Sequence, residues 1–145
     1  MVKSFVRFGY ADRSLLLKGK RSIQLSVIEL VRVERGLPCQ LRYVFCSDEY
    51  LHGINLSFLQ HDDYTDVITF DLSEDSGKLI VGEIYISVDR VLANAKELGL
   101  SFEQEVLRVI FHGSLHLCGY GDKTKVAKAK MRRKEDEYLR NGGVL

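Results

Sequence analysis

The spacing of hydrophobic residues along the chain predicts a mixture of strands and amphipathic helices. Short runs that alternate, or that are rich in β-branched and aromatic residues, indicate strands, whereas apolar residues repeating every three or four positions indicate helices. Strands are expected at residues 3–10, 41–46, 65–72 and 79–87. Helices are expected at residues 22–36, 47–61, 88–99, 102–119 and 123–140.

Local signals support several of these boundaries. Gly36 and the single proline of the chain, Pro38, stop the first helix. Ser101 followed by Gln104 is the Ser-x-x-Gln form of a capping box. The strands come mostly early and the helices mostly late, with a turn between the third and fourth strands that indicates a hairpin. This order favours an α+β fold, a small mixed sheet packed with about five helices, and the absence of a linker predicts one domain over residues 1–145.

Composition narrows the class of protein. The chain has 145 residues, of which 46% are hydrophobic and 28% charged, as is typical of a globular protein. It contains no run of about 18 apolar residues, so no membrane span is expected, and its first residues lack the features of a signal peptide. Three cysteines without paired spacing fit a reducing cytoplasm, and we interpret Cys39 and Cys46 as packing residues.

Charge is distributed unevenly although the net charge is only +1. Residues 47–75 hold eight acids and no Lys or Arg, whereas residues 123–134 hold seven Lys or Arg and no acid. One interpretation is that the acidic segment forms a surface that tolerates cations and the basic segment a surface that attracts phosphates. The alternative is that both segments simply form solvated faces. Candidate RNA-binding residues in the basic segment are Lys123, Lys125, Lys128 and Arg132. Apolar packing surface for this helix is expected from Val126, Ala127, Ala129 and Met131.

The chemistry-bearing segment is "VIFHGSLHLCGYGDKT", residues 109–124. On a helix, His112 and His116 lie about 40° apart and face the same side, as two ligands of one metal ion would. The glycines on either side of Tyr120 permit a sharp reversal that would bring Asp122 to the same ion. Two histidines and one carboxylate suit zinc with an open fourth position, and iron(II) as well. We expect one zinc per chain, with Cys118 on the opposite side of the helix.

The segment "HGSLHLCGYGD" resembles the signature H-G-x-L-H-L-x-G-Y-D-H of the YbeY family of bacterial endoribonucleases. Two further segments match the family, "IN" at 54–55 with "TDVITF" at 65–70, and "GEIYIS" at 82–87. The resemblance implies a cytoplasmic, zinc-dependent, single-strand-specific endoribonuclease that acts in 16S rRNA 3' end maturation and ribosome quality control. It also implies RNA and the ribosome as partners, with no nucleotide cofactor and no membrane.

Two positions depart from the family pattern. The third family histidine falls on Asp122, which is also a metal-binding side chain, and a family arginine thought to serve catalysis falls on Leu59. His61 and Lys123 are candidate replacements for that arginine. Either Glu83 or Asp66 is a candidate to orient the attacking water or the second nitrogen of a ligand histidine.

Other interpretations of the same residues stay open. Tyr120 either stacks on a base or packs beside the turn. The protein could be a ribosome assembly factor whose metal is mainly structural, or a zinc peptidase-like hydrolase. The peptidase is disfavoured because HExxH enzymes place a glutamate where this chain has Gly113.

Overall fold

The structure, a computed structural model that describes residues 2–143, is built on a four-stranded mixed sheet. The strands are β1 (Phe5–Tyr10), β2 (Cys39–Cys46), β3 (Val67–Asp71) and β4 (Ile80–Ser87), in the order β1-β2-β4-β3. β1 and β4 pair in parallel with β2, and β3 pairs antiparallel with β4. The predicted hairpin and the mixed sheet are therefore confirmed.

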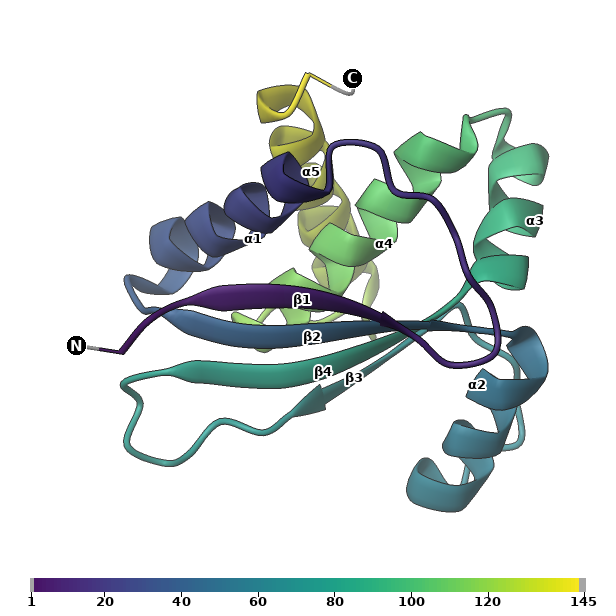
Figure 1. Ribbon diagram of the computed structural model, residues 1–145, viewed down its shortest axis with the longest axis horizontal. Helices are drawn as coiled ribbons and strands as arrows, with labels where there is room; N and C mark the ends of the chain where they lie inside the picture. Colours follow the sequence, from purple (N-terminus) through teal and green to yellow (C-terminus); the bar gives the residue numbers. More distant parts are fainter. Residues whose placement is uncertain (1, 144–145) are drawn as a thin grey trace.

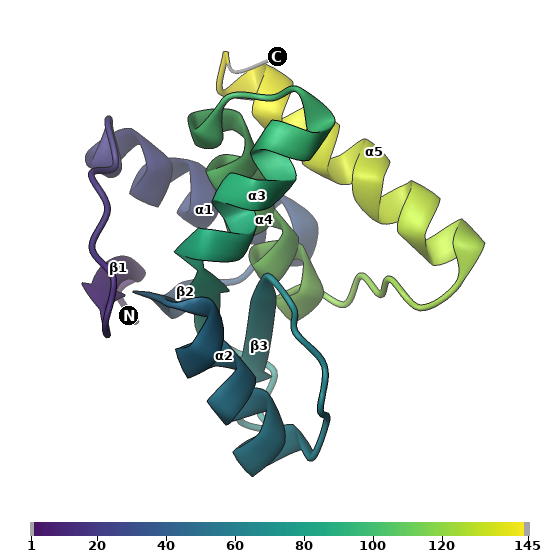
Figure 2. The same cartoon turned by 90° about the vertical axis from the view of Figure 1, so that its right-hand side faces the viewer.

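Helices cover the sheet unequally. The long helices are α1 (Lys20–Arg35), α3 (Val88–Leu98), α4 (Phe102–Leu117) and α5 (Lys125–Asn141). They gather on one side of the sheet, whereas α2 (Asp48–Ile54) lies on the other side (Figures 1 and 2). The predicted α+β fold with about five helices is confirmed, and the side of the sheet that carries α4 and α5 also carries the candidate chemistry.

The helix predicted over residues 47–61 is interrupted. It is α-helical to Ile54 and continues as a wider π-helical segment, η1 (Asn55–Leu59), which ends at Gln60 in the left-handed region at φ 57°. The first helix begins at Lys20 rather than Ser22, and β2 begins at Cys39 rather than Leu41. β2 starts earlier because its pairing with β4 extends back to the partners Cys39 and Ile80.

Helix ends follow their sequence signals closely. The Ser101 hydroxyl accepts from the Gln104 N–H, and the Gln104 side chain accepts from the Ser101 N–H, which completes the predicted capping box. Gly36 ends α1 at φ 66° and donates its N–H to the carbonyl of Arg32. These contacts fix where α4 begins and where α1 ends.

The core lies between the sheet and the long helices, and α4 runs unusually close to β4. An added Cβ at Gly113 of α4 would lie 2.8 Å from Cγ2 of Ile84, and one at Gly82 of β4 would lie 2.6 Å from Cδ1 of Leu117. All three cysteines are buried free thiols, which confirms the packing interpretation of Cys39 and Cys46. Among the described residues, no helix is both long and apolar enough to cross a membrane.

Candidate metal centre

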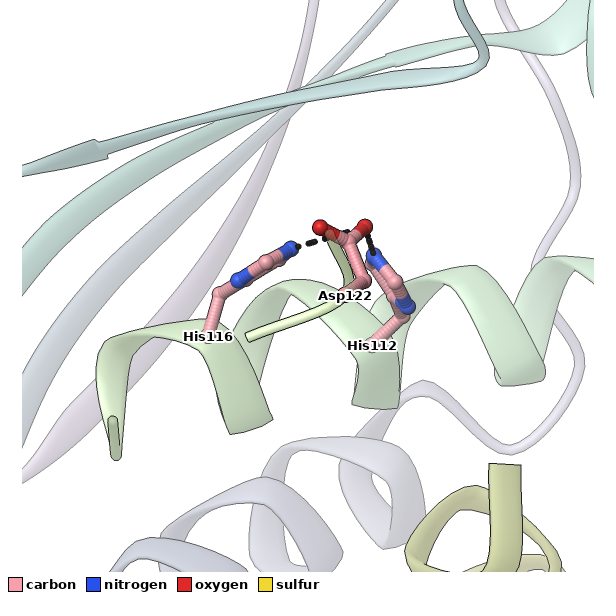
Figure 3. A group of neighbouring side chains, drawn as sticks. All are labelled: His112, His116 and Asp122. Atoms are coloured by element: carbon pink, nitrogen blue, oxygen red, sulfur yellow. Dashed lines mark ion pairs between the residues drawn. The ribbon is translucent and has the colours of Figure 1, made fainter. Parts of the chain in front are cut away.

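His112 and His116 project from the last turns of α4 on the same face. Their ring centroids are 4.7 Å apart and both side chains are partly buried. Figure 3 shows both rings pointing toward the carboxylate of Asp122. The i, i+4 spacing on a well-formed helix is the physical reason that the two imidazoles face one point.

Asp122 reaches the histidines because the chain reverses directly after α4. Gly119 takes φ 104°, and its N–H donates to the carbonyl of His116, whereas the Tyr120 N–H donates to the carbonyl of Leu115. Gly121 has no positive φ, so one glycine makes the reversal rather than the two that the sequence indicated. The structure thus brings together the three candidate ligands that the sequence proposed.

Two of the three distances among the ligand atoms match the spacing around a tetrahedral ion. Asp122 Oδ2 lies 3.4 Å from His112 Nε2 and 3.3 Å from His116 Nε2, and the three ligand atoms lie within 4.8 Å of one another. Ligands at about 2.1 Å from a tetrahedral zinc are about 3.4 Å apart. Among the described residues, this is the group of His, Cys, Asp and Glu side chains that could hold a metal ion.

Tyr120 packs beside the turn after α4 and ties that turn to α1. Its hydroxyl donates to Glu34 Oε1 of α1 at 2.5 Å, and the ring packs on the hydrophobic core. Glu34 Oε2 also accepts from the Tyr138 hydroxyl and from Lys134 Nζ of α5. Burial opposes ionisation of Glu34, but these hydrogen bonds outweigh it and lower the pKa of the carboxyl. Of the two interpretations of Tyr120, the structure therefore supports packing beside the turn.

A second layer of contacts, which the sequence did not predict, lies behind His112. Glu135 of α5 places Oε2 2.8 Å from His112 Nδ1, and Arg108 of α4 donates to Glu135 Oε1 at 3.2 Å. Glu135 is separated from His112 by a turn and much of a helix, so no local pattern indicated the contact. In the sequence, the basic residues around Glu135 indicate phosphate binding rather than a contact with His112.

Electrostatics around the histidine follow from burial and from these carboxylates. Burial alone would lower the pKa of His112, but the hydrogen bond and charge of Glu135, with the charges of Asp122 and Asp66, raise it overall. Burial raises the pKa of Asp66, and the charge of His112 partly offsets that rise. The acids and the imidazole thus form one coupled group.

An open cleft of about 1010 Å³ contains the three candidate ligands. Of the predicted RNA-binding residues, Lys123, Lys128 and Arg132 line the cleft, whereas Lys125, the first residue of α5, does not. The structure therefore divides the basic segment into residues that face the cleft and residues that lie outside it.

The apolar residues of α5 divide in a similar way. Met131 packs in the core as predicted, and Ala127 is partly buried. Val126 is 79% exposed and Ala129 is exposed as well, so the packing role expected of these two residues is wrong. The contact of α5 with the core instead uses Met131, Tyr138 and Leu139.

The remaining candidate residues divide into those that line the cleft and those that do not. Asp66, Leu59 and His61 line the cleft. Glu83 lies elsewhere, 3.6 Å from Arg42 and accepting from the Tyr85 hydroxyl, so it does not belong to this site. Cys118 is buried, which raises the pKa of its thiol to about 12, and it does not belong to the group of described side chains that could hold a metal ion.

Gly113 has a packing reason that bears on the peptidase alternative. The position faces Ile84 of β4, where even a methyl group lacks room. A glutamate side chain beside the first histidine would therefore enter the core rather than the cleft. The arrangement of an HExxH peptidase does not fit on this helix.

Comparisons with known proteins agree on one family. A family profile described as Endoribonuclease YbeY matches residues 17–143. The chain is 39% identical over 139 residues to the Endoribonuclease YbeY of Christiangramia forsetii, covering 96% of this chain and 95% of that protein. It is 44% identical over 139 residues to the Endoribonuclease YbeY of Cytophaga hutchinsonii, covering 96% of each.

A solved structure extends the likeness to the fold. The solution structure of a Thermotoga maritima protein superimposes with a TM-score of 0.63 at 30% sequence identity, over 94% of this chain and 90% of that one. The profile and the relatives span nearly the whole chain, including α4 and the reversal after it. On this evidence the chain belongs to the YbeY family of endoribonucleases.

Proposed function

We propose that this protein is a zinc-dependent, single-strand-specific endoribonuclease of the cytoplasm, formed by one domain over residues 1–145. Its proposed role is 16S rRNA 3' end maturation and ribosome quality control. The observation that carries the proposal is the convergence of His112, His116 and Asp122, with ligand atoms within 4.8 Å of one another, in a cleft with a basic wall. Relatives that align over nearly the full chain carry the name Endoribonuclease YbeY, which supports the cleavage of RNA in this proposal.

His112, His116 and Asp122 would hold one zinc ion per chain through the two Nε2 atoms and a carboxylate oxygen. When bound, such an ion supplies polarisation of a phosphoryl oxygen and a nucleophile that is active at neutral pH. Three protein ligands leave a coordination position for this chemistry, as catalytic rather than structural zinc sites do.

Lys128 and Arg132 stand on the α5 wall of the cleft, and Lys123 belongs to the loop between the reversal and α5. In the proposal they hold successive phosphates of an RNA strand and place one phosphodiester beside the three ligands. Since Leu59 brings no charge to the cleft, the positive charge for the transition state comes from this wall. The sum of these contacts is independent of sequence and sensitive to salt.

We assign Asp66 the role of orienting the attacking water and accepting its proton. It lines the cleft, and Asn94 Nδ2 contacts its Oδ2 at 3.4 Å, so the carboxylate is held from the side of α3. Burial keeps its pKa raised, which favours a carboxylate that accepts a proton and passes it on. Glu83, the other sequence candidate, has no access to this position.

The test is cleavage of an rRNA fragment that carries both paired and unpaired segments, by zinc-loaded protein. The proposal expects cuts in the unpaired segments, loss of cutting in Asp122→Ala, and no hydrolysis of peptides by either protein. Binding to ribosomes without any cleavage would instead support an assembly factor with a structural metal. Hydrolysis of peptides that depends on Asp122 would support the peptidase.

A further inference from the structure

We infer that Glu135 is a positioning residue for the candidate ligand His112, and that Arg108 holds it in place. Metal affinity then depends on the docking of α5 against α4. The inference rests on the metal site of the proposed function, which it deepens by naming the groups that prepare that site. It concerns Nδ1 of His112, the ring nitrogen that is not one of the three candidate ligand atoms.

The first step is the geometry of the His112 ring. Nδ1 lies 2.8 Å from Glu135 Oε2, while Nε2 lies 3.4 Å from Asp122 Oδ2. An ionised carboxylate can only accept a hydrogen bond, so the Nδ1 nitrogen must carry the hydrogen of this contact. The neutral ring then presents the lone pair of Nε2 to the point where the three ligand atoms converge.

The second step is the environment of Glu135. Its side chain is 6% exposed, and the Arg108 side chain that donates to Oε1 is 8% exposed. A buried carboxylate is stable in its charged form only when paired and hydrogen-bonded, and Arg108 meets both needs. Arg108 Nη1 also donates to Asp136 at 2.8 Å, so two neighbouring acids of α5 fix the guanidinium.

The third step is the contrast with His116. The ion pair of His116 runs through Nε2 to Asp122, and within residues 2–143 no carboxylate pairs with its Nδ1 as Glu135 does with that of His112. The two ligand histidines are therefore prepared unequally. His112 is oriented in advance by a carboxylate of a second helix, whereas the ion pair of His116 is, among the described residues, with Asp122 alone.

These steps join the metal site to α5. The helix that provides Glu135 also carries Lys128 and Arg132, the basic wall of the cleft. Carboxylate partners of ligand histidines fix the ring orientation and raise the basicity of the ligand nitrogen, and removing them lowers metal affinity about 10–100-fold. A change that loosens α5 should consequently lower metal affinity as well as phosphate binding.

The experiment compares Glu135→Gln with Glu137→Gln, a matched control on the same helix whose carboxylate is half exposed and pairs with Lys134. Zinc affinity is measured by competition with a chromogenic chelator. Ring ¹⁵N shifts of the metal-free proteins at alkaline pH report the tautomer of each of the four histidines. We expect the Nδ1–H tautomer at His112 in the wild type and a mixture in Glu135→Gln, with about 10–100-fold weaker zinc binding.

Glu137→Gln should match the wild type in both measurements. If Glu135→Gln does not fold, Glu135→Asp keeps the charge beside Arg108 but shortens the reach to Nδ1, and the same two changes are expected. An unchanged tautomer and zinc affinities within about twofold of the wild type, in whichever variant folds, overturn the inference. A wild type that binds no zinc yet has the Nδ1–H tautomer refutes the proposed function instead, and leaves the positioning contact standing.

Discussion

Replacing Gly113 by alanine tests whether the close approach of α4 to the sheet determines the geometry of the candidate metal site. The added Cβ would lie 2.8 Å from Ile84 Cγ2 and 3.3 Å from Cγ1. Ordinary contacts between carbon atoms are about 3.5–4.0 Å, so about 1 Å must be gained by moving α4 or Ile84. Ile84 is completely buried on a central strand, and thus has little room to yield.

Two effects of opposite sign determine how much Gly113→Ala changes the free energy of unfolding. Overpacking of a core costs about 1–3 kcal/mol, while alanine in place of glycine inside a helix gains about 1 kcal/mol. Gly53→Ala isolates the second effect, because Gly53 is helical and nothing lies within 4 Å of an added Cβ. The free energy of unfolding of Gly113→Ala should therefore fall about 1–3 kcal/mol below that of Gly53→Ala.

Urea unfolding measures both variants, and an unchanged m-value shows that only stability differs. Zinc affinity of Gly113→Ala should also fall, since His112 and His116 move with α4 whereas Asp122 belongs to the loop after it. Equal stabilities for the two glycine variants would refute the reasoning, because the sheet would then accept the methyl group without cost.

Three further predictions concern the site and its anchors. Asp122→Ala should bind zinc much more weakly in chelator competition, whereas Asp122→His should retain the metal, because it restores a ligand of the family signature; equal affinities would remove Asp122 from the ligand set. The triple change Lys123→Ala, Lys128→Ala, Arg132→Ala should weaken RNA binding and lower the salt slope by about 0.7 for each phosphate that is no longer neutralised. Glu34→Gln should destabilise the protein by about 1–3 kcal/mol at neutral pH, because the charged acceptor of three hydrogen bonds is removed. The pKa of Glu34 is lowered from 4.5 on folding, so this difference should shrink as the pH falls below about 4.5 in acid unfolding.

Matched controls exist for two of these changes. Lys125→Ala with Arg133→Ala removes charge from α5 outside the cleft lining, and should alter the salt slope less. An equal effect of both sets would make α5 a diffuse basic surface. Glu29→Gln removes an exposed acid from the same helix as Glu34, where it pairs with Arg32, and should change stability little. A destabilisation by Glu29→Gln as large as that by Glu34→Gln would contradict the assigned role of Glu34.

Local patterns were enough to predict the elements that depend on neighbours in sequence. The capping box at Ser101, the end of α1 at Gly36 and the hairpin of β3 and β4 are all set by residues within a few positions of one another. The same holds for His112 and His116, because helix geometry alone places residues four apart on one face. Asp122 follows closely enough that a single turn sets its position.

Contacts between distant segments could not be predicted in this way. Glu135 meets His112, and Glu34 meets Tyr120 and Tyr138, across separations of 23 to 104 residues. The choice of Asp66 over Glu83 for the cleft likewise depends on where the folded sheet and its helices place each side chain.

Periodicity and turn chemistry act over a few residues, and for that reason the strands, the helices and the three candidate ligands could be found in the sequence. The support of the ligands and the set of basic residues that face them came from the folded chain. Those outcomes depend on the packing of α4 on β4 and of α5 on α4, where the lack of room beside Gly113 and the buried pair of Arg108 and Glu135 fix the distances. Packing at that precision follows from the shapes of side chains brought together from the whole chain, which no local pattern contains.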